Sequence, residues 1–337
     1  MVRIVYHDDL KEVQADAPLA ALLAAPAAPA PFDRLEWWRN LAETCDLRPL
    51  IAVARQGEAR AVLPLSRCGK RLHALANWYA FRTGPLFTAD ADRPALLAAL
   101  AADLARQGRH LVLQPLPNEQ GEAQALATAL RRAGWITFVE PCDVNHVLPV
   151  NGRSYAEYLA TRPGPLRTTL KRKAGKVAVT IETAFDPASW ATYEAIYAQS
   201  WKGEEGSPAF LRRFAEEEGR AGRLRLGIAR ADGRAVAAQF WTVEGGTAFI
   251  HKLAYVQGAR PLSPGTTLTA ALLAWVIDRD RVDLVDFGTG DDPYKRDWME
   301  AIRPRFRIEA CRAGWPGNWP LIARRFIRRL VPARLAG

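Results

Sequence analysis

Apolar and polar positions follow two different spacings along the chain, and together these spacings predict an α/β protein. Apolar residues recur at helical spacing in some segments, and strand-length apolar or alternating runs lie between them. The helical spacing predicts helices over residues 32–41, 96–106, 121–133, 155–177, 190–199, 208–218, 268–276 and 319–334. The strand-length runs predict strands over residues 2–6, 50–55, 59–65, 110–114, 144–150, 223–230, 235–244, 247–255 and 283–287.

Local signals refine three of these elements. Asp33 and Glu36 have the spacing of a capping box at the start of the first helix. The helix over 155–177 is broken near its start by Pro163-Gly164-Pro165. The dipeptide Asp232-Gly233 between two strand runs is a strong hairpin signal.

The stretch 247–299 combines a strand, a glycine-proline loop, a helix, a second strand and a charged turn. The loop, Ser263-Pro264-Gly265-Thr266-Thr267, has the composition of a helix start. Such a loop can hold an anion, because the first helical turn has unpaired N–H groups and a favourable dipole. An ordinary strand-to-helix turn would have the same composition, and one glycine does not separate the two interpretations.

Composition and charge narrow the function classes. A length of 337 residues suggests two domains or one large one, and the apolar and charged fractions are those of a globular protein. No apolar run is long enough to span a bilayer. The four cysteines are scattered, which argues against a zinc site and predicts a reducing, cytoplasmic location. A net charge of +10 favours anionic partners, although an arginine-rich composition can also reflect a GC-rich genome.

Several short motifs resemble the GNAT-like acyltransferase domain of the CelD/BcsL group, which is related to the FemAB peptidyltransferases. They are Lys252-Leu253-Ala254-Tyr255, Ser263-Pro264-Gly265, Asp286-Phe287-Gly288, Gly290-Asp291, Tyr294-Lys295, Ser200-Trp201-Lys202-Gly203 and residues 237–241. The resemblance covers roughly residues 30 to 300. It implies tandem GNAT-like domains, each a mixed twisted sheet flanked by helices, with acyl-CoA in the gap between two splayed strands.

The resemblance also implies the domain boundaries. Residues 1–150 would form a degenerate N-terminal domain and residues 151–312 a complete catalytic domain, whereas the residue pattern itself predicts a basic amphipathic tail over residues 313–337. In that tail Leu321, Ile322, Phe326, Ile327 and Leu330 lie against Arg324, Arg325, Arg328 and Arg329. Such a helix can lie in a membrane interface, or it can dock on the domain with its arginines in water.

Acyl transfer from a thioester to an amine needs a donor for the oxyanion, a base for the amine and a shared binding site. The resemblance implies direct attack without a covalent enzyme intermediate. It places the carbonyl-polarising backbone at Lys252, Leu253, Ala254 and Tyr255, and the pyrophosphate loop at Ser263, Pro264, Gly265, Thr266 and Thr267. SPGTT replaces a longer glycine-rich loop, so aminoacyl-tRNA, the donor of the FemAB relatives, stays open as the alternative to acyl-CoA.

Four side chains are the candidate catalytic groups. His251 fits a base because an imidazole titrates near neutrality, and Asp286 could orient it or receive the amine. Tyr294 could protonate the departing thiolate, and Lys295 could pair with a phosphate or carboxylate. The structural alternatives are a packed strand histidine and a helix start in which Asp291 or Asp292 caps and Pro293 leads. The acceptor pocket is predicted at Ser200, Trp201, Lys202, Glu205, Gln239 and Asp291, with a surface loop as the alternative.

The basic segment within 155–177 has two interpretations. Its residues Arg167, Lys171, Arg172, Lys173 and Lys176 form either a solvated face or a collar near ligand phosphates or a membrane. Aromatic residues are not interleaved with them, which disfavours nucleic acid. No GxSxG or strand-linked GxGxxG motif supports a hydrolase or a dinucleotide site.

These observations predict an acyl-CoA-dependent N-acyltransferase acting on a primary amine. The expected acceptor is a lipid, such as a long-chain amino alcohol that is acylated to a ceramide-type amide, or an envelope precursor. Acyl-CoA is a co-substrate, and no permanent cofactor, metal or DNA partner is expected. The location is cytoplasmic, with attachment to the inner membrane through the tail. The alternatives are a FemAB-like aminoacyl-tRNA-dependent transferase and a non-catalytic GNAT-like module in cellulose-type polysaccharide biosynthesis.

Overall fold

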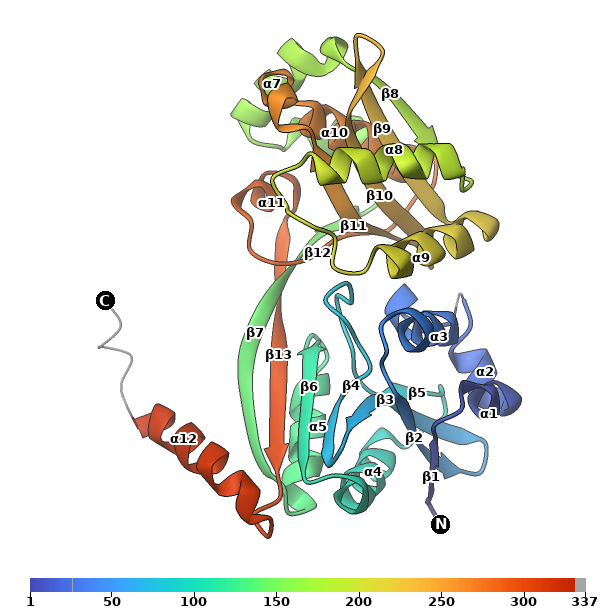
Figure 1. The fold of residues 1–337 in the computed structure, drawn as a ribbon, viewed down its shortest axis with the longest axis vertical. Helices are drawn as coiled ribbons and strands as arrows, with labels where there is room; N and C mark the ends of the chain where they lie inside the picture. Colours follow the sequence, from blue (N-terminus) through green and yellow to red (C-terminus); the bar gives the residue numbers. More distant parts are fainter. Residues whose placement is uncertain (26, 331–337) are drawn as a thin grey trace. The chain divides into compact units, whose positions relative to one another are not determined.

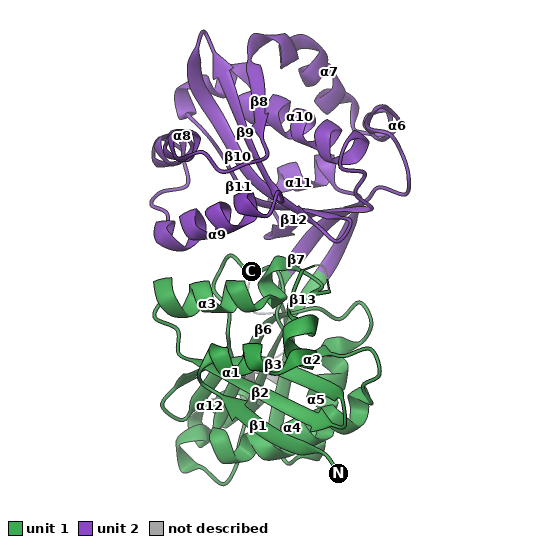
Figure 2. Ribbon diagram, turned by 90° about the vertical axis from the view of Figure 1, so that its right-hand side faces the viewer, with its two compact units in different colours: residues 1–143, 304–337 green, residues 144–303 purple. Residues whose placement is uncertain are grey.

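The computed structural model describes residues 1–25 and 27–330, with the backbone alone for residues 328–330. The chain divides into two compact units (Figure 2). The first consists of residues 1–143 and 304–337, and the second of residues 144–303. Figure 1 labels the elements of both.

The first unit is built on a mixed sheet in the strand order β1-β2-β3-β4-β6-β13. The short strand β5 lies outside this order and pairs with β3. The strands are β1 Arg3–His7, β2 Pro49–Gln56, β3 Ala59–Cys68, β4 Arg71–Ala74, β5 Leu86–Phe87, β6 His110–Leu116 and β13 Ala301–Cys311. β4 and β6 are parallel, while β6 and β13 are antiparallel. Its helices are α1 Leu10–Ala15, α2 Ala17–Leu22, α3 Leu35–Thr44, α4 Arg93–Gln107, α5 Glu122–Arg132 and α12 Trp319–Leu330.

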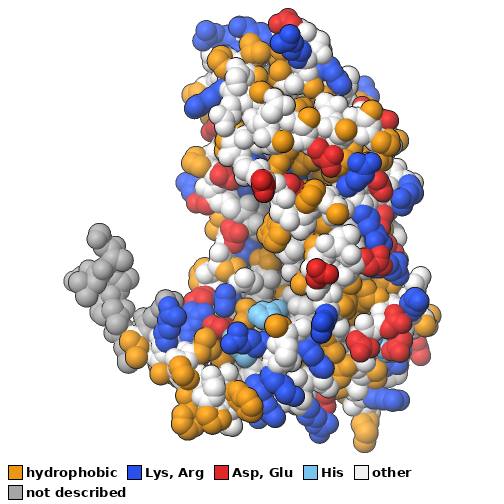
Figure 3. Space-filling model, viewed as in Figure 1, with side chains coloured by type: hydrophobic (Ala, Val, Ile, Leu, Met, Phe, Trp, Pro, Cys, Tyr) orange, Lys and Arg blue, Asp and Glu red, His pale blue; other side chains and the backbone are white. Residues whose placement is uncertain are grey.

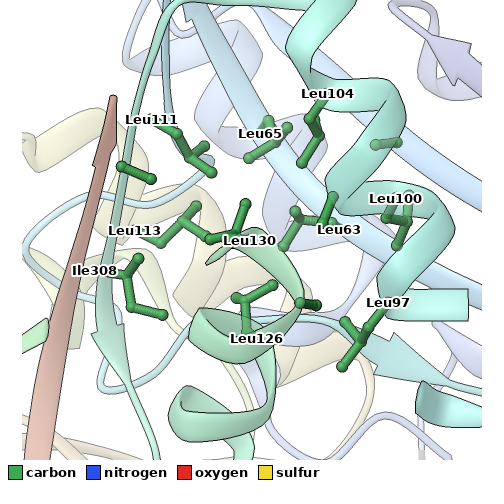
Figure 4. Packing of buried hydrophobic residues seen from close by; sticks show 14 of the residues in the cluster. Leu63, Leu65, Leu97, Leu100, Leu104, Leu111, Leu113, Leu126, Leu130 and Ile308 are labelled. Atoms are coloured by element: carbon green, nitrogen blue, oxygen red, sulfur yellow. The ribbon is translucent and has the colours of Figure 1, made fainter. Parts of the chain in front are cut away.

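The core of the first unit is a leucine-rich layer between the sheet and two helices (Figure 4). Leu100 and Leu104 of α4 and Leu126 and Leu130 of α5 lie at helical spacing and are almost completely buried. They pack on strand residues of the same cluster, among them Leu63, Leu65, Leu111, Leu113 and Ile308. The core therefore includes a residue of β13, which follows the whole second unit in sequence.

In the second unit the strands follow the order β7-β12-β11-β10-β9-β8, with both parallel and antiparallel pairs. Its strands are β8 Ala178–Glu182, β9 Leu224–Ala231, β10 Arg234–Glu244, β11 Thr247–Tyr255 and β12 Leu284–Thr289, together with residues 144–149 of β7 Ile136–Pro149, which begins in the first unit. Its helices are α6 Tyr155–Ala160, α7 Gly164–Lys173, α8 Pro187–Ala198, α9 Pro208–Arg220, α10 Pro264–Asp278 and α11 Pro293–Trp298. Mixed sheets flanked by helices confirm the predicted fold class.

The strands β11 and β12 are parallel, but their hydrogen-bonded pairing ends well before either strand does. They pair from Thr247 with Leu284 to Phe249 with Asp286, and then β11 continues to Tyr255 while β12 continues to Thr289. On its other edge β11 stays paired with β10 as far as Tyr255, so the sheet opens only on the β12 side. This is the splayed pair that the resemblance implied.

Two expectations differ from the structure. Asp33 does not cap α3, the helix predicted over residues 32–41. Pro31 starts a 3-10 turn over Pro31–Asp33, and Arg34 takes the cap position of α3 without a side-chain hydrogen bond. The second unit ends at residue 303 instead of 312, because β13 carries residues 304–311 into the sheet of the first unit. In the described part of the chain, no helix has both the length and the apolarity to cross a bilayer.

We expect Gly227→Ala to lower the free energy of unfolding by about 1–3 kcal/mol, the usual cost of overpacking. A Cβ on Gly227 of β9 would lie 2.9 Å from the Cδ1 atoms of Leu268 and Leu272, which are buried on α10. Urea unfolding should show a lower midpoint with an unchanged slope. Gly175→Ala is the matched control, since a Cβ there meets nothing within 4 Å. Equal stability of the two variants would contradict close packing of α10 on β9.

Candidate functional site

A pocket of about 250 Å³ lies in the second unit, where β11 and β12 have parted. Its walls come from β11, the first turns of α10, the loop after α8, and α7 and α11. The lining residues are Leu166, Trp201, Leu253, Tyr255, Gly265, Thr266, Thr269, Tyr294, Asp297 and Trp298. Most of the wall is apolar or aromatic, which suits an acyl chain or another apolar ligand.

The start of α10 forms one wall of this pocket. Ser263 precedes the helix with a φ of 52°, and Pro264 occupies its first turn. Gly265 and Thr266 follow, and the amides of a first turn have no acceptor within the helix. A Cβ on Gly265 would lie 3.4 Å from Cδ1 of Tyr255, in van der Waals contact with that ring, which packs on Trp201 at 4.5 Å between centroids.

The side chain of Gln239 holds this wall in place. Its Nε2 donates to the carbonyl oxygen of Gly265 at 3.2 Å and to Oγ1 of Thr269 at 2.7 Å. Its Oε1 accepts from Nε1 of Trp241 at 2.9 Å. Gln239 was predicted to bind the acceptor, but these hydrogen bonds give its amide a positioning role, in which it ties β10 to the first turns of α10.

One residue of the basic segment reaches the same loop. Nζ of Lys173, near the end of α7, donates to Oγ of Ser263 at 3.1 Å. The neighbouring Lys171 and Arg172 are exposed. Positive charge therefore lies beside the N-terminus of α10, where the helix dipole also favours an anion. The contact of Lys173 favours the collar interpretation over a purely solvated face.

His251 lies on the opposite face of β11 from the pocket. The pairing of β10 with β11 shifts between Phe240–Lys252 and Trp241–Ile250, which leaves His251 as an extra, bulged residue. Its ring packs against Phe214 and Phe240 at 5.0 and 5.1 Å. Its Nε2 shares a hydrogen bond with Oγ1 of Thr242 at 2.8 Å. Its role as a base stays a prediction, and its surroundings are those of a packed strand histidine.

Asp286 sits at the last pair of β12 with β11, and one oxygen of its carboxylate accepts two hydrogen bonds. Oδ1 accepts from Nδ2 of Asn145 at 2.6 Å and from the amide of Gly288 at 2.8 Å. The side chains of Asp286 and Asn145 are buried. Asp286 thereby fixes the geometry of β12 at the point where the strands part, and its catalytic role stays a prediction.

The segment that leads from the end of β12 into α11 contains three of the predicted site residues, Asp291, Tyr294 and Lys295. Tyr294 lines the pocket, and burial, followed by the charge of Asp292, raises the pKa of its phenol, so it is protonated at neutral pH. The buried Lys295 donates its ammonium to the carbonyl oxygens of Thr289 and Gly290. Asp292 occupies the cap position of α11 without a side-chain hydrogen bond, so Lys295 closes this turn in place of a capping aspartate.

Sequence analysis missed a pair at this turn between a buried histidine and an exposed aspartate. Nε2 of His146, on β7, lies 3.0 Å from Oδ1 of Asp291. Oδ2 of Asp291 accepts from Nη2 of Arg296 at 2.6 Å. These hydrogen bonds lower the pKa of the Asp291 carboxyl. The available signal was the pair Asn145-His146 inside an otherwise apolar strand, because buried polar residues are rare without partners.

The loop after α8 contributes one lining residue, Trp201. Oγ of Ser200 donates to the carbonyl oxygen of Tyr197 and so ends the helix. Nζ of Lys252 donates to Glu205 at 2.9 Å. Desolvation, together with the charges of Lys252 and Lys295, lowers the pKa of Lys202 to about 8.

The predicted residues therefore separate into two groups. Those that line the pocket are Trp201, Leu253, Tyr255, Gly265, Thr266 and Tyr294. Those that the lining does not include are Ser200, Lys202, Glu205, Gln239, His251, Lys252, Ala254, Ser263, Pro264, Thr267, Asp286, Asp291 and Lys295. Among the described residues, no three His, Cys, Asp or Glu side chains are grouped to hold a metal ion.

We expect the amine of Lys202 to titrate with a midpoint near pH 8. Because this pKa is lowered from the ordinary value of 10.5, Lys202 contributes stability that increases as the pH rises from about 8 towards 10.5. NMR of reductively ¹³C-methylated lysines would follow the titration, and Lys202→Arg would remove the resonance and so assign it. A midpoint above about pH 10 would show an ordinary solvated lysine.

Comparison with known proteins places this site in a known type of fold. The model of the acetyltransferase (GNAT) domain family matches residues 166–296, and no curated protein matches the chain. The C-terminal domain of a protein assigned as lysylphosphatidylglycerol synthetase from Agrobacterium fabrum is similar, with 13% identity, 93% of this chain and 95% of that chain covered, and a TM-score of 0.57.

Two further solved structures share the architecture. FemX is 11% identical over 91% of this chain and 96% of its own, with a TM-score of 0.60. A tandem GNAT protein from the clavulanic acid biosynthesis pathway is 14% identical over 91% and 98%, with a TM-score of 0.53. At these identities the likeness concerns the fold, and it is the fold of a GNAT-type acyltransferase.

Proposed function

We propose that the protein is an acyl-CoA-dependent N-acyltransferase that transfers an acyl group from a thioester to a primary amine. The observation that carries the proposal is the apolar pocket at the parted strands, with the N-terminus of α10 as one wall. A CoA thioester is an anionic diphosphate joined to an apolar acyl chain. The first turn of α10 with Lys173 suits the diphosphate, and the apolar walls suit the acyl chain.

The reaction would proceed by direct attack of the amine on the thioester carbonyl. The edge of β11 beyond Phe249 has left β12, so backbone amides of Lys252 to Tyr255 are the proposed donors to the oxyanion. As the tetrahedral intermediate collapses, the carbon–sulfur bond breaks and the CoA thiolate accepts a proton. Tyr294 is the proposed proton donor, since it lines the pocket and holds its proton at neutral pH.

Two side chains fit the base that takes the proton of the attacking amine. His251 fits by chemistry, but it lies across β11 from the pocket. Lys202 follows the pocket-lining Trp201, and its pKa of about 8 leaves part of its amine neutral under physiological conditions. The position of Lys202 favours it, and the imidazole of His251 remains the candidate predicted from the sequence.

The proposed acceptor is a lipid with a primary amine, such as a long-chain amino alcohol. Leu166, Leu253, Trp201 and Trp298 line the pocket, and aromatic and aliphatic walls favour a hydrocarbon chain. The name of one structural neighbour, lysylphosphatidylglycerol synthetase, denotes a lipid product for that protein. The alternative acceptor for the same transfer reaction is an envelope precursor with an exposed amine.

We expect palmitoyl-CoA to stabilise the protein more than acetyl-CoA does in thermal-shift and calorimetric titrations. A ligand at about 100 times its dissociation constant adds about 2.7 kcal/mol to the free energy of unfolding. Gly265→Leu should abolish the effect by filling the pocket beside Tyr255. Gly258→Leu is the matched control, because a Cβ there meets nothing within 4 Å.

The three ligands separate the competing functions. Equal stabilisation by CoA, acetyl-CoA and palmitoyl-CoA would indicate a short acyl donor. Absence of binding to all three would overturn the acyl-CoA proposal and favour aminoacyl-tRNA as donor or a non-catalytic module. A steep salt dependence of tRNA binding would then identify the first of these.

We expect Tyr294→Phe to lower kcat by about 10²-fold or more, because proton transfer by a positioned side chain contributes on that scale. The phenylalanine keeps the ring contact with Phe287, so CoA binding should persist. Tyr255→Phe is the control, since Tyr255 also lines the pocket and loses the same hydroxyl. Steady-state rates and CoA titration would be measured for both variants. Equal losses in both would exclude a special role for the Tyr294 hydroxyl.

A further inference from the structure

The C-terminal helix α12 exposes large apolar side chains to solvent. Trp315 before the helix is 46% exposed, and Trp319, Phe326 and Ile327 are 60%, 48% and 60% exposed. Trp319, Phe326 and Ile327 lie at helical spacing, so they share one side of α12. We call these four residues the α12 face.

One arginine of the same helix, Arg325, points into the protein. Nε of Arg325 donates to Oε2 of Glu309 at 2.7 Å, and its Nη1 donates to Oε2 of Glu140 at 2.8 Å. Glu309 is buried and also lies 2.9 Å from Nε2 of His110. A helix that docked only for stability would bury its apolar residues and leave its arginines in water. Here that arrangement is reversed at Arg325.

Several contacts hold the α12 face in place. Nδ2 of Asn318 donates to the carbonyl oxygens of Arg109 and Arg312, and Nε1 of Trp319 donates to that of Ala313. One edge of Phe326 packs on Phe138 at 5.6 Å between centroids. The exposed apolar side chains therefore belong to an anchored surface.

Exposed basic side chains lie beside this surface. The guanidinium of Arg109 lies 6.0 Å from the ring centre of Trp315, and Arg109 is joined through its backbone to Lys70. Arg109, Lys70, Arg71 and Arg324 are all exposed. Figure 3 shows apolar and basic side chains gathered on this part of the first unit. The side chains of Arg328 and Arg329, which the tail prediction included, lie outside the described residues.

We propose that the α12 face, with Arg109 and Arg324 beside it, binds the surface of a bilayer that contains anionic phospholipids. Tryptophan favours the interfacial zone, and arginines beside it attract anionic headgroups. A second copy of the chain fits less well, because a symmetric contact would pair this surface with itself and so bring the basic residues of both copies, Arg324 and Arg109, into one interface. The proposal rests on the first unit alone and does not depend on the transfer reaction.

The test is co-sedimentation of the full chain with vesicles in the absence of acyl donor. We expect binding to vesicles of phosphatidylcholine with phosphatidylglycerol, weak binding to phosphatidylcholine alone, and a loss of binding as salt is raised. The double variant Phe326→Glu/Ile327→Glu should bind at least about tenfold more weakly, which corresponds to about 1.4 kcal/mol. Trp78→Ala is the matched control, since Trp78 is a 64% exposed tryptophan of the same unit and should bind as the natural chain does.

Arg324→Glu provides a second variant that leaves the apolar residues in place, in case the double variant fails to fold. It should weaken binding to anionic vesicles and leave the weak binding to neutral vesicles unchanged. Absence of binding to anionic vesicles, or equal binding by the natural chain and both variants, would overturn the proposal. A dimer that Phe326→Glu/Ile327→Glu converts to a monomer, without any vesicle binding, would instead identify the α12 face as a contact between copies.

Discussion

The early separation of β11 from β12 is the constraint on which the site depends. Parallel pairing stops after Phe249 and Asp286, and an unpaired strand edge inside a sheet costs free energy unless something else occupies it. The structure fixes this point from both sides. Asp286 is held by Asn145 and Gly288 on the β12 side, and β11 remains registered with β10 through the bulge at His251.

The helix that follows the opening is positioned as closely as the strands. Gly227 lets α10 approach β9, Gln239 ties its first turns to β10, and Lys173 contacts the loop that leads into it. A buried amide such as Gln239 would be costly without partners, so the same hydrogen bonds that satisfy it also fix the pocket wall. The packing of α10 on β9 and the hydrogen bonds of Gln239 thus place the start of α10 at the gap between β11 and β12.

The elements of the second unit were largely predictable because their local signals agree with their tertiary roles. Asp232 and Gly233 both have positive φ angles of 48° and 75°, as the hairpin signal requires, and the strand over 247–255 has the predicted bounds. β13 was missed although Arg305 and Arg307 alternate with its apolar residues, because arginines are rarely buried and this strand contains a buried one. The buried Arg305 is satisfied by the carbonyl oxygen of Phe81 and by Glu119, which are distant in sequence.

The site itself was predicted less completely, and the bulge in β11 explains much of the difference. In a regular strand His251 would share a face with Leu253 and Tyr255, both of which line the pocket. One extra residue reverses that relation and turns the imidazole towards Phe214. The pair formed by His146 and Asp291 could not be derived either, since it joins residues separated by most of the second unit.

The path of the chain has a consequence for synthesis. The first unit takes β13 from a segment that follows the whole second unit, and β13 pairs with β6 and contributes Ile308 to the leucine core. During translation, β6 therefore emerges long before its partner and keeps an open edge until residue 311 has left the ribosome. The strands β7 to β12 can pair with one another before β13 emerges. A chain that stops early would carry a finished pocket beside an unfinished sheet, with the exposed edge of β6 as its point of aggregation.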